Sequence, residues 1–251
     1  MFKTYSWIVV LLVPLMIQGC TTTGQVVTDI DAPNEALLQA AGNHAGLIEL
    51  YKTRLMNAGN VQEQDQCRYQ LGQAYLAMSD PESTLFYIKP VTDEGRGNDQ
   101  LWLLKSRAYL ALDQPDKSLY CAETALAIKN NNPYVHNQLG QVYARVGDYA
   151  GSRAAFTEAR VLMLDDVIVK NNLAMLDILE SDYDSAVRRL MPVYNAGQAD
   201  DTVKANLVLA LVRSGRYDEF VSVMQSAETE EERVVLFSIL AALEPVIRNR
   251  E

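Results

Sequence analysis

The stretch NQLGQVYARVGDYAGSRAAFTEA, residues 137–159, decides the fold of this chain. Apolar residues recur three and four positions apart on either side of a break at Gly147-Asp148, with the small residues Gly140 and Ser152 among them. Apolar residues at this spacing lie on one face of an α-helix. A small residue in that face lets a second helix approach closely. The stretch therefore predicts two packed helices joined by a turn.

The same pattern recurs every 34 residues without an insertion. A single helix pair cannot bury both of its faces, so successive pairs must stack on one another. We therefore predict an all-α fold, one solenoid with five repeats. The predicted repeats are 65–98, 99–132, 133–166, 167–200 and 201–227.

This repeat resembles the tetratricopeptide repeat, and the resemblance implies a right-handed superhelical solenoid. Trp102 occupies the aromatic fourth position of that family, and Gly147-Asp148-Tyr149 matches its turn closely. Lys105 and Asp177 stand at repeat positions that are normally apolar. The resemblance therefore implies less favourable packing in the second and fourth repeats.

Helical patterns flank the five repeats on both sides. Residues 34–60 predict a degenerate N-terminal helical hairpin, broken at Gly42-Asn43. At the other end, Thr229-Glu230-Glu231-Glu232 forms a capping-box pattern before the apolar run Val234–Leu243. We therefore expect residues 228–251 to hold a capping helix that seals the last repeat.

The first residues have the pattern of an export signal. Lys3 is followed by the apolar run Trp7–Ile17, which is too short to span a bilayer. A short charged start, a short apolar core and small residues after it indicate a secretory signal peptide over residues 1–19. Ile17-Gln18-Gly19-Cys20 resembles a bacterial lipobox. The alternative is an ordinary signal peptide followed by a chance cysteine.

The lipobox resemblance implies a lipid anchor on Cys20. Acyl chains contribute about 0.8 kcal/mol per buried methylene, so three chains on one cysteine would hold the protein firmly. Thr21 stands where Asp would imply retention in the inner membrane, so the implied location is the periplasmic face of the outer membrane. Residues 20–33 are small and polar without helical periodicity, and they predict a flexible tether.

Composition and residue content exclude several classes of function. The 251 residues carry a formal net charge of −10 without a basic stripe, which argues against a nucleic-acid partner. His44 and His136 are isolated, and the sequence has neither a glycine-rich phosphate loop nor a Ser or Cys nucleophile near a histidine. We therefore expect no enzyme activity, no metal, no small-molecule substrate, and no cofactor beyond the lipid. Cys67 and Cys121 are expected to be buried thiols rather than a disulfide.

Polar residues on the first helix of each repeat predict a peptide-binding groove. First helices line the concave surface of such a stack, and carboxamides there can donate to and accept from a peptide backbone. We expect the peptide to lie along Gln138, Asn172 and Asn206, with arginines available for acidic groups. The candidate residues are Tyr69, Gln73, Arg107, Asn137, Gln138, Gln141, Arg145, Asn171, Asn172, Asn206 and Arg213. The alternative is a solvated polar face, with the contact on the convex side or the C-terminal cap.

The last repeats carry a narrower resemblance. Val169–Ala174 (VKNNLA) and Lys204–Leu207 (KANL) flank a segment that contains Leu190-Met191-Pro192. This arrangement is similar to that of the TadD-type lipoproteins of the tight adherence (Flp pilus) secretion system. The resemblance implies a pilotin-like assembly role, with the secretin or another pilus component as partner. A type IV pilus pilotin, or an adaptor for a periplasmic peptidoglycan hydrolase or protease, is the alternative.

Overall fold

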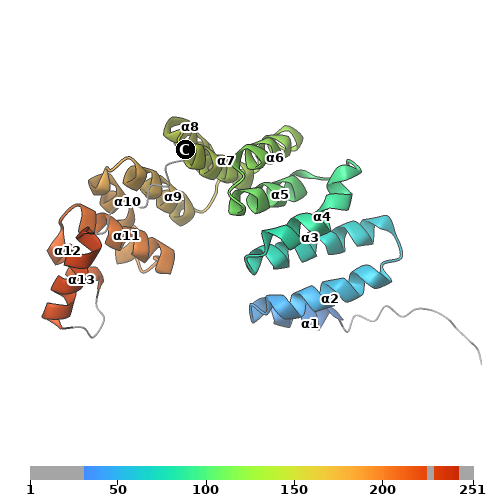
Figure 1. Ribbon diagram of the computed structural model, residues 1–251, viewed down its shortest axis with the longest axis horizontal. Helices are drawn as coiled ribbons and strands as arrows, with labels where there is room; N and C mark the ends of the chain where they lie inside the picture. The colour runs from blue at the N-terminus through green and yellow to red at the C-terminus, as the bar shows by residue number, and fades with distance from the viewer. Residues whose placement is uncertain (1–30, 225–228, 243–251) are drawn as a thin grey trace, which may run out of the picture.

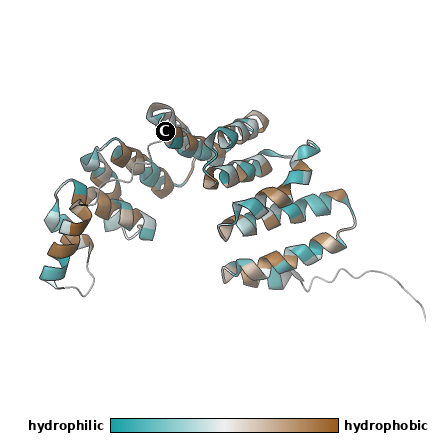
Figure 2. Ribbon diagram, in the orientation of Figure 1, coloured by the Kyte–Doolittle hydropathy of each residue, from teal (hydrophilic) through white to brown (hydrophobic). Residues whose placement is uncertain are grey.

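The computed structural model describes residues 31–224 and 229–242, within which there are thirteen α-helices and no strand. The predicted signal peptide, Cys20 and residues 20–30 of the predicted tether lie outside the described residues, as does the end of the chain from residue 243. Every helix carries both hydrophobic and hydrophilic residues (Figure 2), as expected where each helix buries one side.

The helices of the five repeats follow the 34-residue period. The first helices are α3 (Val61–Ala77), α5 (Asp99–Ala111), α7 (Pro133–Val146), α9 (Asp166–Leu179) and α11 (Asp201–Arg213). The second helices are α4 (Pro81–Asp93), α6 (Pro115–Ile128), α8 (Tyr149–Val161), α10 (Tyr183–Asn195) and α12 (Tyr217–Val223). All five second helices begin 34 residues apart. The turn residues therefore predict helix starts well.

The repeats stack into an arch, with the first helices on its inner side (Figure 1). Successive first helices contact one another, from α3 against α5 through to α9 against α11. Within the described residues, no such contact joins consecutive second helices, so these spread apart on the outer side. The inner surface is therefore built from the first helices, as the repeat pattern predicts.

Close approach within the first four repeats depends on small residues at two positions, the eighth and the twentieth, counted from the first residue of the repeat. A Cβ atom on Gly140, at the eighth position, would lie 2.5 Å from the ring of Phe156. In the first three repeats the hydroxyl at the twentieth position donates to the carbonyl at the eighth. These pairs are Thr84 with Gly72 (3.0 Å), Ser118 with Ser106 (2.8 Å) and Ser152 with Gly140 (2.6 Å). The hydrogen bonds join the two helices where they are closest.

The turn inside each repeat uses a left-handed backbone conformation. The residues with positive φ are Ser79 (59°), Asp113 (56°), Gly147 (85°), Ser181 (62°) and Gly215 (72°). All five stand at the fifteenth position of their repeats. Glycine adopts this conformation without a steric penalty, and the other residue types do not.

The N-terminal hairpin consists of α1 (Asp31–Ala40) and α2 (His44–Asn57). Residues 31–33, expected in the tether, form the first turn of α1, where Pro33 is tolerated because its missing N–H has no helical acceptor there. Glu35 of α1 accepts from the Tyr51 hydroxyl (2.7 Å), pairs with Arg54, and accepts from Gln70 of α3 (3.5 Å). Polar contacts therefore tie this hairpin to the first repeat.

Helix α13 (Glu230–Ala242) covers the last repeat. Its capping box is formed, because the Thr229 N–H donates to Glu232 (2.7 Å) and the Glu232 N–H donates to the Thr229 hydroxyl (3.3 Å). The ring of Phe237 lies 5.2 Å from those of Tyr217 and Phe220. Among the described helices, none has the length and apolar content needed to cross a bilayer.

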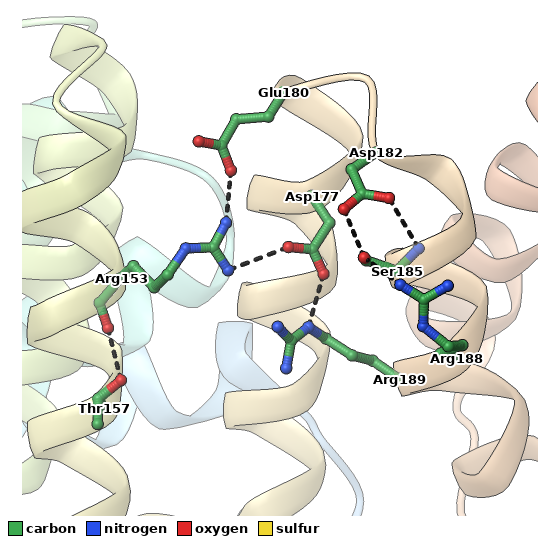
Figure 3. A network of polar contacts seen from close by, with 8 residues as sticks. All are labelled: Arg153, Thr157, Asp177, Glu180, Asp182, Ser185, Arg188 and Arg189. Atoms are coloured by element: carbon green, nitrogen blue, oxygen red, sulfur yellow. Dashed lines mark hydrogen bonds and ion pairs between the residues drawn. The ribbon is translucent and has the colours of Figure 1, made fainter.

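Asp177 is buried at the junction of the third and fourth repeats, with 3% of its surface exposed. Arg153 of α8 donates to one carboxylate oxygen (3.0 Å) and Arg189 of α10 to the other (2.6 Å), while Arg153 also pairs with Glu180 (Figure 3). The expected packing defect is therefore a charge network across three helices. Lys105, the other unusual residue, donates to Thr92 (3.0 Å) and lies 4.8 Å over the Trp102 ring.

Cys67 and Cys121 are both buried, and no disulfide bond joins them. Cys67 lies in α3 and Cys121 in α6. Burial raises the pKa of the Cys121 thiol to about 11, so this thiol stays protonated at neutral pH. Both side chains therefore act as small apolar groups in the core.

Changing Gly140→Ala should destabilise the protein by about 1–3 kcal/mol, because the new methyl group would overlap the buried Phe156 ring. Urea unfolding measures this change. Gly59→Ala is the matched control, since the closest atom to its Cβ would be 3.7 Å away. Equal stability of the two variants would contradict the close helix contact.

Changing Asp177→Asn should destabilise the protein by about 1–3 kcal/mol, because two arginines lose a buried charged acceptor. Asp184→Asn, at a carboxylate 65% exposed and 3.5 Å from Arg216, should leave the Tm unchanged. Calorimetry compares the two variants. A Tm for Asp177→Asn equal to that of the unaltered chain would show that the network is dispensable.

Candidate functional site

An open hollow of about 480 Å³ lies on the inner surface of the arch, where α3, α5 and α7 meet. Leu76, Leu103 and Leu104 give it apolar walls, and Arg107 of α5 and Tyr134 of α7 add polar groups. No acidic side chain is among the described residues that line it. We refer to this cavity as the Arg107 hollow.

A second hollow of about 490 Å³ adjoins the first along α3 and α5. The two share Tyr69 and Gln100, so a ligand can extend from one into the other. In the second hollow, Arg96 donates to both carboxylate oxygens of Asp65 (2.6 and 2.8 Å). The charges there are therefore already paired within the protein.

Arg107 is different, because it makes no hydrogen bond or ion pair with any side chain in the described part of the chain. Burial lowers the pKa of its guanidinium, and the hydroxyls of Tyr69 and Tyr134 partly oppose this effect. The group nevertheless stays charged, because the arginine guanidinium is not deprotonated in proteins. A positive charge that is partly removed from water and has no counter-ion is unfavourable unless a ligand supplies one.

Tyr69 places a second donor in the Arg107 hollow. Gln73 donates from Nε2 to the Tyr69 hydroxyl oxygen at 3.0 Å, which leaves the hydroxyl hydrogen free to donate elsewhere. Burial raises the pKa of Tyr69, with Asp99 adding to the effect and Arg107 opposing it, so the hydroxyl is protonated at neutral pH. Asp99 itself accepts a hydrogen bond from Asn132 (2.7 Å).

The predicted asparagines form a ladder along the other half of the inner surface. Asn172 donates to Asn137 (2.6 Å) and Asn206 donates to Asn171 (2.8 Å), so the amides bond to one another across α7, α9 and α11. Each of these amides therefore has one group engaged within the protein, and its remaining N–H or carbonyl groups are available for a peptide. Gln141 is half-buried on α7 and lines neither hollow.

Three of the predicted residues do not stand open in the groove. Gln138 is 1% exposed and donates to Ser118 inside the stack (3.4 Å), because its side chain turns toward α6. Arg145 pairs with Asp113 (2.5 Å), and Arg213 donates to the carbonyl of Ala241 (3.4 Å). Of the three predicted arginines, Arg107 is therefore the one whose charge is open to a ligand.

The prediction missed Gln100 and Tyr134, which both line the Arg107 hollow. Each stands at the second position of its repeat, and this position faces the concave side of such stacks, so the repeat frame held the signal. Within the described residues, no cluster of three His, Cys, Asp or Glu side chains could hold a metal ion.

Changing Arg107→Leu should leave the Tm unchanged or raise it, because no ion pair is lost and a buried charge is removed. Arg153→Leu is the matched control and should lower the Tm, since Arg153 bonds to Asp177 and Glu180. Differential scanning calorimetry of both variants makes the comparison. A fall as large as that of the control would mean that Arg107 serves the fold.

No protein-family model matches this chain, and no curated protein matches its sequence. Among solved structures, a thermophilic tetratricopeptide-repeat protein of Thermus thermophilus superposes with a TM-score of 0.55 at 17% identity, over 84% of this chain and 97% of that one. A tetratricopeptide-repeat protein from Parabacteroides merdae gives 0.62 at 13% identity, over 83% of each chain. The Cut9–Hcn1 hetero-tetramer of the APC/C gives 0.64 at 15% identity, over 84% of this chain and 40% of that one.

At these identities the likeness concerns the fold. The arch, the period and these structures agree on an all-α, right-handed tetratricopeptide-repeat solenoid. Because each repeat contacts only its neighbours, such a stack leaves an extended inner surface open for binding. The chain therefore has the fold of a tetratricopeptide-repeat solenoid.

Proposed function

We propose that this chain is a non-enzymatic scaffold whose inner surface holds an extended segment of a partner protein. The observation that carries the proposal is the unpaired Arg107, which lies in a hollow that continues into a second one along α3 and α5. Hollows lined by leucine, tyrosine and amide side chains suit a peptide, which offers apolar side chains and backbone groups together.

The lipobox resemblance supports a lipid anchor on Cys20 and a place on the periplasmic face of the outer membrane. Ten residues, 21–30, lie between that cysteine and the start of α1, and a flexible tether of this length would span roughly 5–6 Å times the square root of the residue number, or about 16–19 Å. A scaffold held this close to the membrane meets membrane-bound partners at high effective concentration, so a modest peptide affinity suffices.

The resemblance to TadD-type lipoproteins supports a role in assembling a Flp/Tad pilus. The partner would then be the secretin or another pilus component, which the scaffold helps to reach the outer membrane or to remain stable there. This role requires the scaffold to bind its partner at the membrane and requires no catalytic step. An open hollow on the inner surface suits such binding.

Deletion of the gene should lower the amount of Flp/Tad secretin in outer-membrane fractions, and the unaltered gene should restore it. Cys20→Ala should fail to restore it, because the scaffold loses its anchor. Gln100→Trp should also fail, since Gln100 is exposed between the two hollows and the larger ring fills them. Quantitative immunoblotting of the fractions gives the result.

Arg160→Trp places the same ring on the exposed surface of α8 and serves as the control, which should restore the secretin fully. Unchanged secretin in the deletion strain would contradict the pilotin-like role. A fall confined to a type IV pilus secretin would move the role to that system.

A further inference from the structure

We propose that the Arg107 hollow binds the side-chain carboxylate of a glutamate or aspartate inside the partner's bound segment. This inference rests on the proposed function and names the chemistry that the inner surface selects. Its basis is the combination of an open cavity, an arginine without a counter-ion, and a second converging donor.

The charge of the hollow is opposite to that of the whole protein. The chain has 32 acidic and 22 basic residues, yet no acidic side chain lines this cavity among its described residues. Other inner arginines are already engaged, Arg145 by Asp113 and Arg96 by Asp65. Although the chain has many acidic residues, none of those that the structure describes pairs with Arg107. A carboxylate of the partner protein would supply the missing counter-ion.

The donors in the hollow suit a carboxylate. The guanidinium of Arg107 presents a planar set of N–H groups that matches the two oxygens of a carboxylate. The Tyr69 hydroxyl, which already accepts from Gln73, has its hydrogen available for one of those oxygens. Charge-assisted hydrogen bonds of this kind are about twice as strong as neutral ones. A neutral glutamine in the same place would therefore bind less tightly.

The surroundings favour an acidic residue within the segment over a terminal carboxylate. The hollow continues past Gln100 into the second hollow, and it also reaches Tyr134 of α7 and Asn132, the N-cap residue of that helix. A bound chain can therefore extend in both directions from Arg107. Leu76 of α3, a partly buried residue that lines the hollow, favours an apolar residue near the acid.

Isothermal titration calorimetry on the full lipidated chain in detergent tests this with defined peptides. The probes are acetyl-Ala-Gln-Leu-Glu-Leu-Gln-Ala-amide and its counterpart with glutamine in place of the central glutamate. The unaltered chain should bind the glutamate peptide about tenfold more tightly. Arg107→Gln should abolish the difference, Tyr69→Phe should reduce it, and Arg160→Gln, on the exposed surface of α8, should preserve it.

Equal affinity for the two peptides, or a preference that survives Arg107→Gln, would overturn the inference and leave groove binding intact. If neither peptide binds, the inference and the proposed peptide groove are both contradicted. A third probe, acetyl-Ala-Gln-Leu-Leu with a free C-terminal carboxylate, tests whether the hollow binds a terminal carboxylate instead of an acidic side chain. Tighter binding of this probe than of the glutamate peptide would overturn the assignment to an internal acid.

Discussion

Close approach of the two helices inside each repeat is the contact on which the rest of this structure depends. In the first four repeats a glycine or another small residue at the eighth position removes the bulk that would hold the helices apart, and a hydroxyl such as that of Ser152 donates to the buried carbonyl of Gly140. Gly147, in a left-handed backbone conformation, then lets the chain turn back into the second helix of the repeat. Because neither face of such a pair is fully covered, the next repeat must pack against it.

Stacking places polar side chains from separate repeats beside one another on the inner surface. In the half nearer the C-terminus these side chains bond among themselves, as Asn172 does with Asn137. In the other half they leave a hollow in which Arg107 has no partner among the residues that the structure describes. The buried Asp177 network holds α8, α9 and α10 together close to where one half passes into the other. The groove therefore has a closed, self-bonded part and an open, charged part.

Most of the fold follows from the sequence, because the period and the turn residues are local signals. Helix starts such as Pro81 and Tyr149 fall where the spacing puts them. The site can be predicted from the sequence only in part. The position of a residue within its repeat determines which way its side chain points, but it does not determine which residue that side chain contacts. Arg145 bonds to Asp113, which is 32 residues away in the sequence, and Arg153 bonds to Asp177, which is 24 residues away. Such pairings depend on the packing of separate repeats, which no single repeat encodes.

Site-specific photocrosslinking in cells tests most directly whether the inner surface is where the partner binds. A photoreactive phenylalanine at Gln66, exposed in the second hollow, is compared with one at Ala154, exposed on the second helix α8. We expect the photoreactive group at Gln66 to capture the proposed partner, a pilus-assembly component, which mass spectrometry identifies, and we expect Arg107→Gln to reduce this product greatly. Capture of that component from Ala154 but not from Gln66 would contradict this expectation.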